Sequence, residues 1–314
     1  MTDFHALQAR FGDDFAVDEP LSRYTVAQLG GPASALVRVR HLADLQWAVR
    51  WAHHQGLAWR MLGGGANVLV SDEGFRGLVI INKANQVIFD PQKPGIVTAE
   101  SGANLSTLVR RCMAKGLKGL EWGVNVPGTV GGAVVNNAGA HGGDMHGNLL
   151  DAQVLDLQGG APSTSELNGE LWSVEAFEYA YRHSKLKGQH GRYGVLSARL
   201  RLEPGHDPAE LTTIADGFVA HRKATQPPGA SLGSMFKNPP GDYAGRLIEA
   251  AGLKGQQMGG VQISPVHANF FVNVGGGSAA DYLALIRLAQ QTVQARFGVA
   301  LELEIEWLGL PPGG

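Results

Sequence analysis

Residues 119–143 read GLEWGVNVPGTVGGAVVNNAGAHGG, a stretch with eight glycines and one formally charged residue, Glu121. Glycine loses more backbone entropy on folding than other residues, so this density is expected where the chain needs positive φ or a close approach to its main chain. Either the stretch forms tight turns inside a sheet, or it forms a loop whose backbone N–H groups bind a large, often anionic ligand. Glycine density alone does not separate these interpretations.

The length and composition describe an ordinary globular protein. The chain has 314 residues, enough for two or three domains, with 44% hydrophobic residues, 17% charged residues and a net charge of −2. This balance favours neither nucleic acid nor a membrane surface as a partner. The single cysteine, Cys112, excludes an internal disulfide and is expected to be a buried, inert thiol. With no leader-like N-terminus and no apolar run of about 18 residues, we expect a cytoplasmic protein.

The pattern along the chain mixes helices and strands. Apolar spacing predicts a helix over residues 42–52 that ends at Gly56, and three strands separated by loops within residues 59–82. A further strand is expected within residues 95–102, followed by a helix over 104–117 with Asn104 as N-cap. These elements indicate an α+β fold. Mostly strands are expected between the glycine-rich stretch and about residue 205, where we place a boundary.

The C-terminal part has its own set of predicted elements. A helix is expected over residues 208–222, followed by a long loop over 225–245 that is rich in Pro, Gly and Ser. Asp242 is predicted to cap the next helix, which Gly252 closes. A Ser-x-x-Asp box at residue 278 opens another helix, which stops at Gly298. Strict alternation predicts one last strand over 299–307, with Glu302, Glu304 and Glu306 together on its polar face.

Several familiar motifs are absent or out of context. The GGGAN loop leads into a strand and lacks the G-x-G-x-x-G spacing, and no G-x-x-x-x-G-K-[ST] occurs, so Rossmann and P-loop interpretations are excluded. GASLG at 229–233 matches a serine-hydrolase elbow but lacks the strand before and the helix after. HGGDMH at 141–146 places two histidines and an aspartate together, yet no further ligand cluster supports a metal site.

Seven motifs together resemble one known family. They are YTVAQLGGPA, LGGGANVLVSDEGFRG, NVPGTVGGAVVNNAGA, YRHSKLKG, SLGSMFKNPPGDYAGRLIEAAGLKG, HANFFVN and LELEIEWLG. Their order and spacing resemble the UDP-N-acetylenolpyruvoylglucosamine reductase (MurB) family of bacterial flavoenzymes over nearly the whole chain. The resemblance implies a two-part FAD-binding domain of the vanillyl-alcohol-oxidase (PCMH) type plus a C-terminal α/β substrate-binding domain. The corresponding boundaries are residues 1–83, 84–204 and 205–314.

The chain departs from the family pattern at three positions. Asn125, Leu303 and Glu306 stand where the family usually has Gly, Pro and Arg, although Asn125 can still adopt a left-handed conformation. Little room exists between Leu202 and Pro208 for the tyrosine-bearing loop that some members carry. The chain therefore resembles the shorter class of the family.

The resemblance also implies which residues act. FAD would bind noncovalently, and NADPH would reduce it before a hydride passes to C3 of an enolpyruvyl ether. Arg182 would bind the substrate carboxylate with its planar fork, Ser234 would protonate C2 with help from a neighbour such as Lys237, and Glu304 would be the second acid. The cofactor-binding candidates are Gly63, Gly64, Gly65, Ala66, Asn67, Val68, Gly128, Thr129, Gly131, Gly132, Ala138 and Gly139.

The substrate-binding candidates carry amide and basic groups that suit a diphosphate and uracil, namely Gln226, Lys237, Asn238, Arg246, His267 and Asn269. The implied product is UDP-N-acetylmuramate, a peptidoglycan precursor. Two alternatives stay open from the residues alone, another FAD-dependent oxidoreductase of the same fold and a non-catalytic flavin or nucleotide-sugar binding protein. The partners expected are small molecules only. The sequence does not distinguish NADPH from NADH, and we expect a monomer.

Overall fold

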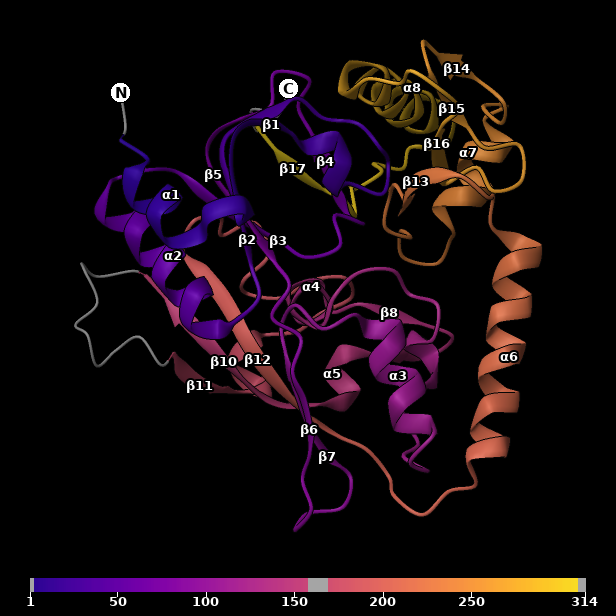
Figure 1. Ribbon diagram of the computed structural model, residues 1–314. Helices are drawn as coiled ribbons and strands as arrows, with labels where there is room; N and C mark the ends of the chain where they lie inside the picture. Colours follow the sequence, from indigo (N-terminus) through magenta and orange to yellow (C-terminus); the bar gives the residue numbers. More distant parts are fainter. Residues whose placement is uncertain (1–2, 158–168, 310–314) are drawn as a thin grey trace. The chain divides into compact units, whose positions relative to one another are not determined.

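The computed structural model describes residues 3–157 and 169–309, and its backbone divides into two compact units (Figure 1). The first unit combines Met1–Val17, Ser34–Gly64 and Gly77–Ala220. The second combines Asp18–Ala33, Gly65–Arg76 and His221–Gly314. Each unit thus draws on segments that are far apart in the sequence. The predicted boundaries at residues 83/84 and 204/205 stay predictions.

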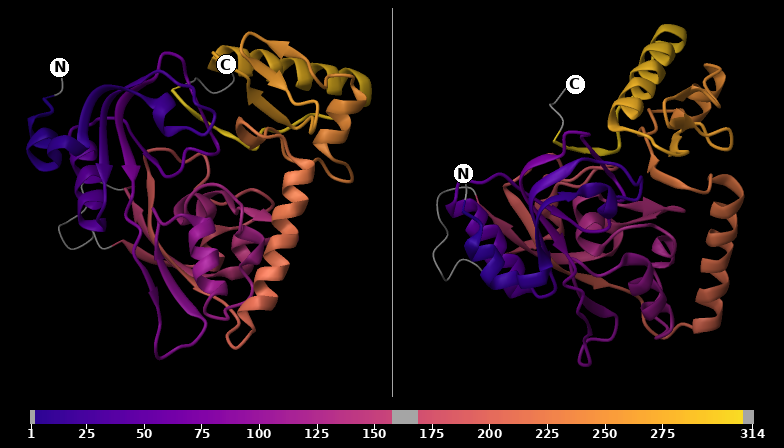
Figure 2. Two further views of the ribbon diagram at one scale, coloured as in Figure 1. Left: turned by 45° about the vertical axis from the view of Figure 1, so that its right-hand side comes forward. Right: turned by 45° about the horizontal axis from the view of Figure 1, so that its top comes forward.

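A four-stranded sheet lies mostly in the first unit. Its order is β1 (Phe15–Pro20), β2 (Pro32–Val39), β5 (Phe75–Asn82) and β3 (Trp59–Leu62), with β3 and β5 parallel. Helices α1 (His5–Phe11) and α2 (Leu42–His54) lie side by side (Figure 2), with Trp47 edge-on to Phe11. The helix predicted from residue 42 is confirmed. Its apolar face and the sheet share one core that includes Leu45, Val49 and Ile80.

A five-stranded antiparallel sheet completes the first unit. Its order is β11 (Glu170–Ser173), β10 (Leu149–Asp156), β12 (Tyr193–Arg201), β7 (Ile96–Glu100) and β6 (Val87–Phe89). Three helices share a core with this sheet, α3 (Leu105–Met113), α4 (Val130–Asn136) and α5 (Met145–Asn148). The Asn104 cap is confirmed, because its side chain accepts the Thr107 N–H at 2.9 Å. Burial in this core raises the pKa of the Cys112 thiol to about 12.

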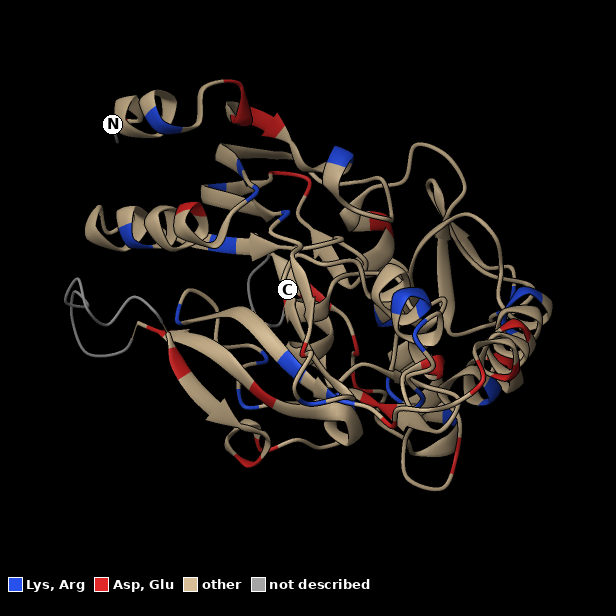
Figure 3. Ribbon diagram, turned by 60° about the horizontal axis from the view of Figure 1, so that its bottom comes forward, with Lys and Arg blue, Asp and Glu red and all other residues tan. Residues whose placement is uncertain are grey.

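Helix α6 (Pro208–Thr225) confirms the helix predicted over residues 208–222. Leu211 and Ala215 are its buried residues, and Phe218 and Val219 pack against the same core as α3. The exposed surface of the helix is mostly polar but includes Ile214. Figure 3 shows acidic and basic residues interspersed over helices and strands, as the small net charge suggests.

The second unit is built on a four-stranded antiparallel sheet. Its order is β13 (Ala230–Ser234), β16 (Phe270–Asn273), β15 (Val261–Ile263) and β14 (Gln257–Met258). Helices α7 (Ala244–Ala250) and α8 (Ala279–Phe297) cover its core, which contains Phe236, Phe271 and Tyr282. The predicted capping box at Ser278 and Asp281 is confirmed, and Gly298 ends α8 in a left-handed conformation.

Two predictions about this unit need correction. The expected loop over residues 225–245 contains strand β13, whose few apolar residues hide its pairing with β16. The expected strand over 299–307 is divided, because its hydrogen bonds go to two different partners. Leu303 forms an isolated antiparallel bridge with Phe236, whereas β17 (Glu306–Leu308) pairs in parallel with β4 (Val68–Val70). Within residues 3–157 and 169–309, no helix is long and apolar enough to cross a membrane.

Candidate active site

The glycine-rich stretch at residues 119–143 is partly helical, so neither tight turns in a sheet nor a loop describes all of it. Val130–Asn136 is helix α4, and Thr129 is its N-cap, with a weak contact to the Gly132 N–H at 3.5 Å. Gly128 precedes the cap at φ +116°, a conformation that side chains disfavour. Small apolar residues at 130, 133 and 134 bury one side of the helix. Asn125 is exposed and is not among the positive-φ residues, so the left-handed conformation considered for it does not occur.

A second glycine segment lies directly against the first within the first unit. A Cβ placed on Gly64 would lie 2.9 Å from the Gly128 Cα, and one on Gly63 would lie 2.2 Å from the Thr129 Oγ1. On the other side of α4, a Cβ on Gly131 would lie 2.8 Å from the Ser101 Cβ. Real Cβ atoms do not tolerate such distances. The glycines at these positions therefore allow two main-chain segments to touch.

The loop after β3 also presents unpaired donors. Within the described residues, the N–H groups of Gly64, Gly65 and Ala66 make no hydrogen bond. Successive free N–H groups in a glycine loop form a concave site for an anion such as a diphosphate. Asn67, by contrast, is tied to the C-terminal segment, since its carbonyl accepts the Glu306 N–H at 2.8 Å and its side chain donates to the Glu304 carbonyl at 3.2 Å. Val68 starts strand β4.

Arg182 lies on a loop that holds the end of α4. Its guanidinium donates to the Gly139 carbonyl and sits 5.1 Å above the Tyr181 ring. Its backbone is left-handed at φ +54°, which is unusual for a non-glycine residue and is typical of functional segments. Ala138 and Gly139, two of the cofactor candidates, thus lie in the segment that Arg182 binds.

Residues on either side of Arg182 form three further hydrogen bonds with residues 134–137, at the end of α4. The Tyr179 hydroxyl donates to the Val134 carbonyl at 2.8 Å, and Ser184 donates to Val135. Asn137, 3% exposed, donates to the Ala180 carbonyl at 3.0 Å and accepts the His146 N–H at 2.9 Å. These bonds fix Arg182 relative to α4.

The second unit contains a pocket of about 390 Å³. It brings together Ser234 and four of the six substrate candidates, Asn238, Arg246, His267 and Asn269. The hydroxyl of Ser234 makes no hydrogen bond within the described residues, so it is available to a ligand. The pocket also contains residues that sequence reasoning missed, Tyr243, Gly245, Glu249, Val266 and Ala268. Val266 and Tyr243 are both exposed. Val266 is next to the predicted His267, but an apolar or aromatic residue in a loop does not by itself indicate a binding role.

Ser234 and Glu304 are brought close by the main chain. The Glu304 N–H donates to the Met235 carbonyl at 3.0 Å, and the Lys237 N–H donates to the Glu302 carbonyl at 2.8 Å. Ser234, the predicted proton donor, and Glu304, the predicted second acid, therefore lie on adjacent segments of the second unit. Glu304 is half-buried, whereas the side chain of Glu302 is 73% exposed, so the three glutamates do not share one solvated face.

Lys237 and Gln226 lie outside the pocket lining. The Lys237 ammonium pairs with the Glu302 carboxylate. Its assistance to the Ser234 hydroxyl stays a prediction. Gln226 follows α6 and accepts a hydrogen bond from the Arg222 Nε. Burial lowers the pKa of that Arg222 guanidinium.

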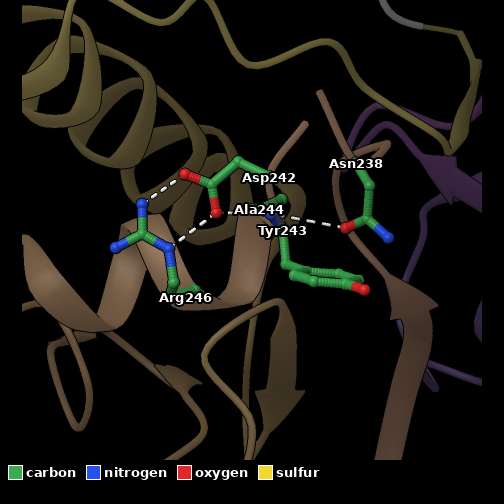
Figure 4. Close-up of polar contacts among 5 residues, drawn as sticks. All are labelled: Asn238, Asp242, Tyr243, Ala244 and Arg246. Atoms are coloured by element: carbon green, nitrogen blue, oxygen red, sulfur yellow. Dashed lines mark hydrogen bonds and ion pairs between the residues drawn. The ribbon is translucent and has the colours of Figure 1, made fainter. Parts of the chain in front are cut away.

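The start of α7 differs from the expected cap (Figure 4). Asp242 does not cap the helix; it forms a two-point ion pair with Arg246, including a 2.6 Å bond from Nε, and this pairing lowers the pKa of Asp242 to about 2. The first N–H of the helix, that of Ala244, is instead bound by the Asn238 side chain at 3.1 Å. A carboxylate four residues before an arginine prefers the arginine when the helix end has another acceptor. The charge of Arg246 is therefore compensated within the protein.

His267 and Asn269 lie at the base of the pocket. Burial lowers the pKa of His267, and its Nδ1 accepts the Asn269 N–H at 3.2 Å, so the neutral ring carries its proton on Nε2. Asn269 is 3% exposed, and its side chain binds the backbone of Phe236. Gly245 packs against the His267 ring, where a Cβ would come within 2.9 Å.

The two motifs considered as alternatives have other roles. GASLG lies in strand β13 and not in a strand-turn-helix elbow. In HGGDMH, His141 stacks on Phe218 at 4.2 Å and Asp144 caps α5 through the Gly147 N–H at 3.0 Å. His146 packs against Tyr179. Among the described residues, no group of three His, Cys, Asp or Glu side chains is arranged to hold a metal ion.

Comparison with known proteins gives the class first. Residues 33–161 match the family profile "FAD binding domain", and residues 224–308 match "UDP-N-acetylenolpyruvoylglucosamine reductase, C-terminal domain". The glycine segments fall in the first match and the pocket falls in the second. The chain is therefore an FAD-binding flavoprotein of α+β fold with a separate C-terminal domain.

Full-length relatives give the family. A UDP-N-acetylenolpyruvoylglucosamine reductase of Prochlorococcus marinus is 46% identical over 92% of both chains, and one of Streptococcus agalactiae is 41% identical over 95% of both. The crystal structure of the reductase from Thermus caldophilus superposes with a TM-score of 0.74 at 33% identity, covering 94% of this chain and 98% of that one. This chain belongs to the UDP-N-acetylenolpyruvoylglucosamine reductase (MurB) family.

Proposed function

We propose that this protein reduces the enolpyruvyl ether of UDP-N-acetylglucosamine-enolpyruvate to UDP-N-acetylmuramate, a step of peptidoglycan precursor synthesis. Two features of one chain carry the proposal. The glycine segments at residues 63–65 and 128–132 fall within the match to the FAD-binding profile, and the pocket that Ser234 lines falls within the match to the reductase C-terminal domain. Either feature alone would suit a binding protein. Together they supply a redox site and a proton donor.

The glycine segments suit FAD on physical grounds. Gly63, Gly64 and Gly131 leave no room for a Cβ, and the N–H groups of Gly64, Gly65 and Ala66 are available for a diphosphate. The residues that would hold the cofactor are Gly63, Gly64, Gly65, Ala66, Asn67, Val68, Gly128, Thr129, Gly131, Gly132, Ala138 and Gly139. When bound, FAD supplies hydride transfer, from NADPH to the flavin and then to C3 of the ether.

Side chains of the protein would supply the proton and stabilise the negative charge that develops on the substrate. Hydride addition at C3 places negative charge at C2 and on the carboxylate, and protonation at C2 completes the saturated ether. The Ser234 hydroxyl has no other described partner and is the proposed proton donor to C2. Arg182, whose guanidinium donates to the Gly139 carbonyl, would bind the substrate carboxylate with its planar fork. Glu304, on the segment next to Ser234, would hydrogen-bond the developing enolate.

The pocket offers polar groups with compensated charge. Asn238 and His267 can donate hydrogen bonds to a sugar or nucleobase, and Arg246 stays cationic while paired with Asp242. Lys237 and Gln226, which are outside the lining, remain predicted ligands for other parts of the UDP-sugar. We further propose that the protein acts in the cytoplasm as a monomer, which light scattering after gel filtration tests.

One spectroscopic experiment tests the function. We expect the purified protein to be yellow, to release FAD on denaturation, to be bleached by NADPH and to recover colour when the enolpyruvyl substrate is added anaerobically. A colourless protein that takes up no FAD contradicts the proposal. Flavin that is bleached but not recovered by the substrate points to another FAD-dependent oxidoreductase, and flavin that is never bleached points to a binding protein.

A further inference from the structure

Asn269 occupies an unusual position at the edge of the sheet in the second unit. Strand β16 begins one residue later, at Phe270, and strand β13 ends at Ser234. Beyond these ends the sheet has no regular ladder, yet residues 235–236 stay attached to Asn269. The Met235 N–H donates to the Asn269 carbonyl at 2.8 Å. The sheet is thus extended by one further bond.

The Asn269 side chain continues this attachment. Its Oδ1 accepts the Phe236 N–H at 2.9 Å, and its Nδ2 donates to the Phe236 carbonyl at 2.8 Å. The amide of the side chain therefore takes the place of a peptide group in a neighbouring strand. A carboxamide is the shortest side chain that offers both a donor and an acceptor in this geometry.

The opposite side of the same segment is bound by the C-terminal segment. Glu304 donates its N–H to Met235, Lys237 donates its N–H to Glu302, and Phe236 forms a bridge with Leu303. Residues 235–237 lie between the Asn269 side chain and residues 302–304. The two residues assigned to the proton and the enolate, Ser234 and Glu304, flank this arrangement.

Burial argues against a direct role in ligand binding. Asn269 is 3% exposed although it lines the pocket, and its Oδ1 and Nδ2 both bind Phe236. The His267 Nδ1 accepts its backbone N–H at 3.2 Å and holds it from the other side. Removing the side chain would leave a buried N–H and a buried carbonyl without partners, which the backbone can relieve only by moving.

We infer that Asn269 is a positioning residue for the reduction, which fixes Ser234 and Glu304 relative to each other through the backbone of Phe236, and that it is not a substrate ligand. This inference rests on the proposed function. A displacement of about 1 Å of a reacting group can cost on the order of 10²-fold in rate. The effect should appear in the step that needs the proton and not in substrate affinity.

The test is Asn269→Leu, which keeps the branched shape at Cγ and removes both side-chain bonds. We expect near-normal FAD content and flavin reduction by NADPH within about 2-fold of wild type, since neither step uses the proton donor. Reoxidation by saturating enolpyruvyl substrate should slow by roughly 10- to 100-fold, with the substrate Kd within about 3-fold. In a Ser234→Ala background, the same substitution should add little, because its effect passes through Ser234.

Asn273→Ala is the matched control. Asn273 lies at the end of β16, which begins directly after Asn269, and makes three side-chain bonds, to the Ala27 carbonyl and the N–H groups of Gly275 and Gly277, none of them to residues 234–236. We expect a lower Tm and an unchanged rate of reoxidation. A similar slowing in Asn273→Ala would mean that Asn269 acts only through stability, and would overturn the inference.

Other outcomes are equally decisive. If Asn269→Leu raises the substrate Kd but leaves the reoxidation rate at saturating substrate normal, Asn269 is a substrate ligand. If its slowing of reoxidation is additive with that of Ser234→Ala, Asn269 does not act by positioning Ser234. If Asn269→Leu does not fold, Asn269→Asp keeps one bond and is measured in the same way. If neither folds, rapid hydrogen exchange at the Phe236 N–H of the wild type contradicts the inference, and strong protection supports it. Wild-type reduced protein that the substrate fails to reoxidise removes the proposed function itself.

Discussion

The glycine segments of the first unit and the 234–238 segment of the second unit are held in place by opposite means. Around Gly64 and Gly131 the main chain packs against main chain because side chains are missing. Around Phe236 the main chain is held by a side chain, the buried amide of Asn269. The first arrangement leaves backbone donors open for a ligand, whereas the second pairs the N–H groups of Met235, Phe236 and Lys237.

This difference predicts which kind of substitution should disrupt each region. Adding atoms harms the glycine segments, because a Cβ has no room between the two segments that touch. Removing atoms harms the second region, because its geometry depends on a few polar bonds.

Gly64→Val or Gly131→Val should abolish FAD binding. The new Cβ would lie 2.9 Å from the Gly128 Cα or 2.8 Å from the Ser101 Cβ, so the two segments must separate. Flavin content after gel filtration measures the loss, and a retained cooperative transition would report the folded second unit. Gly217→Val, on the exposed side of α6 with nothing within 4 Å, is the control and should keep its flavin. Normal flavin in both test variants would show that the contact is not needed.

Ser234→Ala should separate the two half-reactions. The hydroxyl acts after the hydride arrives, so flavin reduction by NADPH should be nearly normal while reoxidation by saturating substrate slows by about 10²- to 10⁴-fold. Stopped-flow absorbance of the flavin follows each direction. Equal slowing of flavin reduction and reoxidation would mean that Ser234 shapes the flavin site. No slowing of reoxidation would point to Glu304 as the proton source.

Asn137→Ala tests whether the first unit also contains a side-chain clamp. The substitution removes the bonds to Ala180 and His146 and should cost about 1–3 kcal/mol in the free energy of unfolding, measured in urea. Asn137 is left-handed at φ +43°, so Asn137→Gly separates the loss of the bonds from backbone strain. If Asn137→Ala is as stable as wild type, the bonds around Arg182 do not hold that loop.

The pH dependence of His267 gives the smallest expected effect. Burial lowers the pKa of His267 below its unfolded value of about 6.5. The unfolded chain therefore binds more protons in that window, so this contribution to stability is complete above pH 6.5 and is lost as the pH falls towards the folded pKa. Lys254, which also lowers the pKa, and Glu249, which raises it, face the ring.

An NMR titration of the His267 ring measures this pKa directly. His267→Gln should reduce the fall in Tm between pH 7.5 and 5.5, because it removes the titrating group while keeping a side chain that can accept the Asn269 N–H. A midpoint at or above 6.5 would contradict the prediction. In that case the protonated ring would carry a hydrogen on both nitrogens, and its Nδ1 could not accept the Asn269 N–H.

Much of the fold was predictable from local patterns. The helices at 42–54, 105–113, 208–225 and 279–297 follow apolar spacing and caps such as Asn104 and Ser278, which act within a few residues. Strand β13 and the divided C-terminal segment were not predicted. Their pairing depends on partners such as Phe270 and Val68, far along the chain, and short strands carry little periodicity of their own.

The candidate site shows the same division. Quoted motifs were enough to name Ser234, Asn238, Arg246 and His267, which the structure brings into one pocket. They could not give the pairing of Lys237 with Glu302 or of Arg246 with Asp242, because a salt bridge depends on which rotamers meet in space. Residues predicted for a diphosphate therefore proved to have compensated charges.

The sequence by itself determined the family, the α+β class and the chemical groups available, because motifs and periodicity are local properties of the chain. Only the tertiary structure determined what those groups do. Asn269 and Asn238 carry the same amide and both line the pocket, yet the Asn269 amide is buried against the backbone of Phe236, whereas the Asn238 amide binds the start of α7. Burial and partner depend on segments distant in sequence, and these two quantities decide whether an amide binds substrate or positions the residue that does.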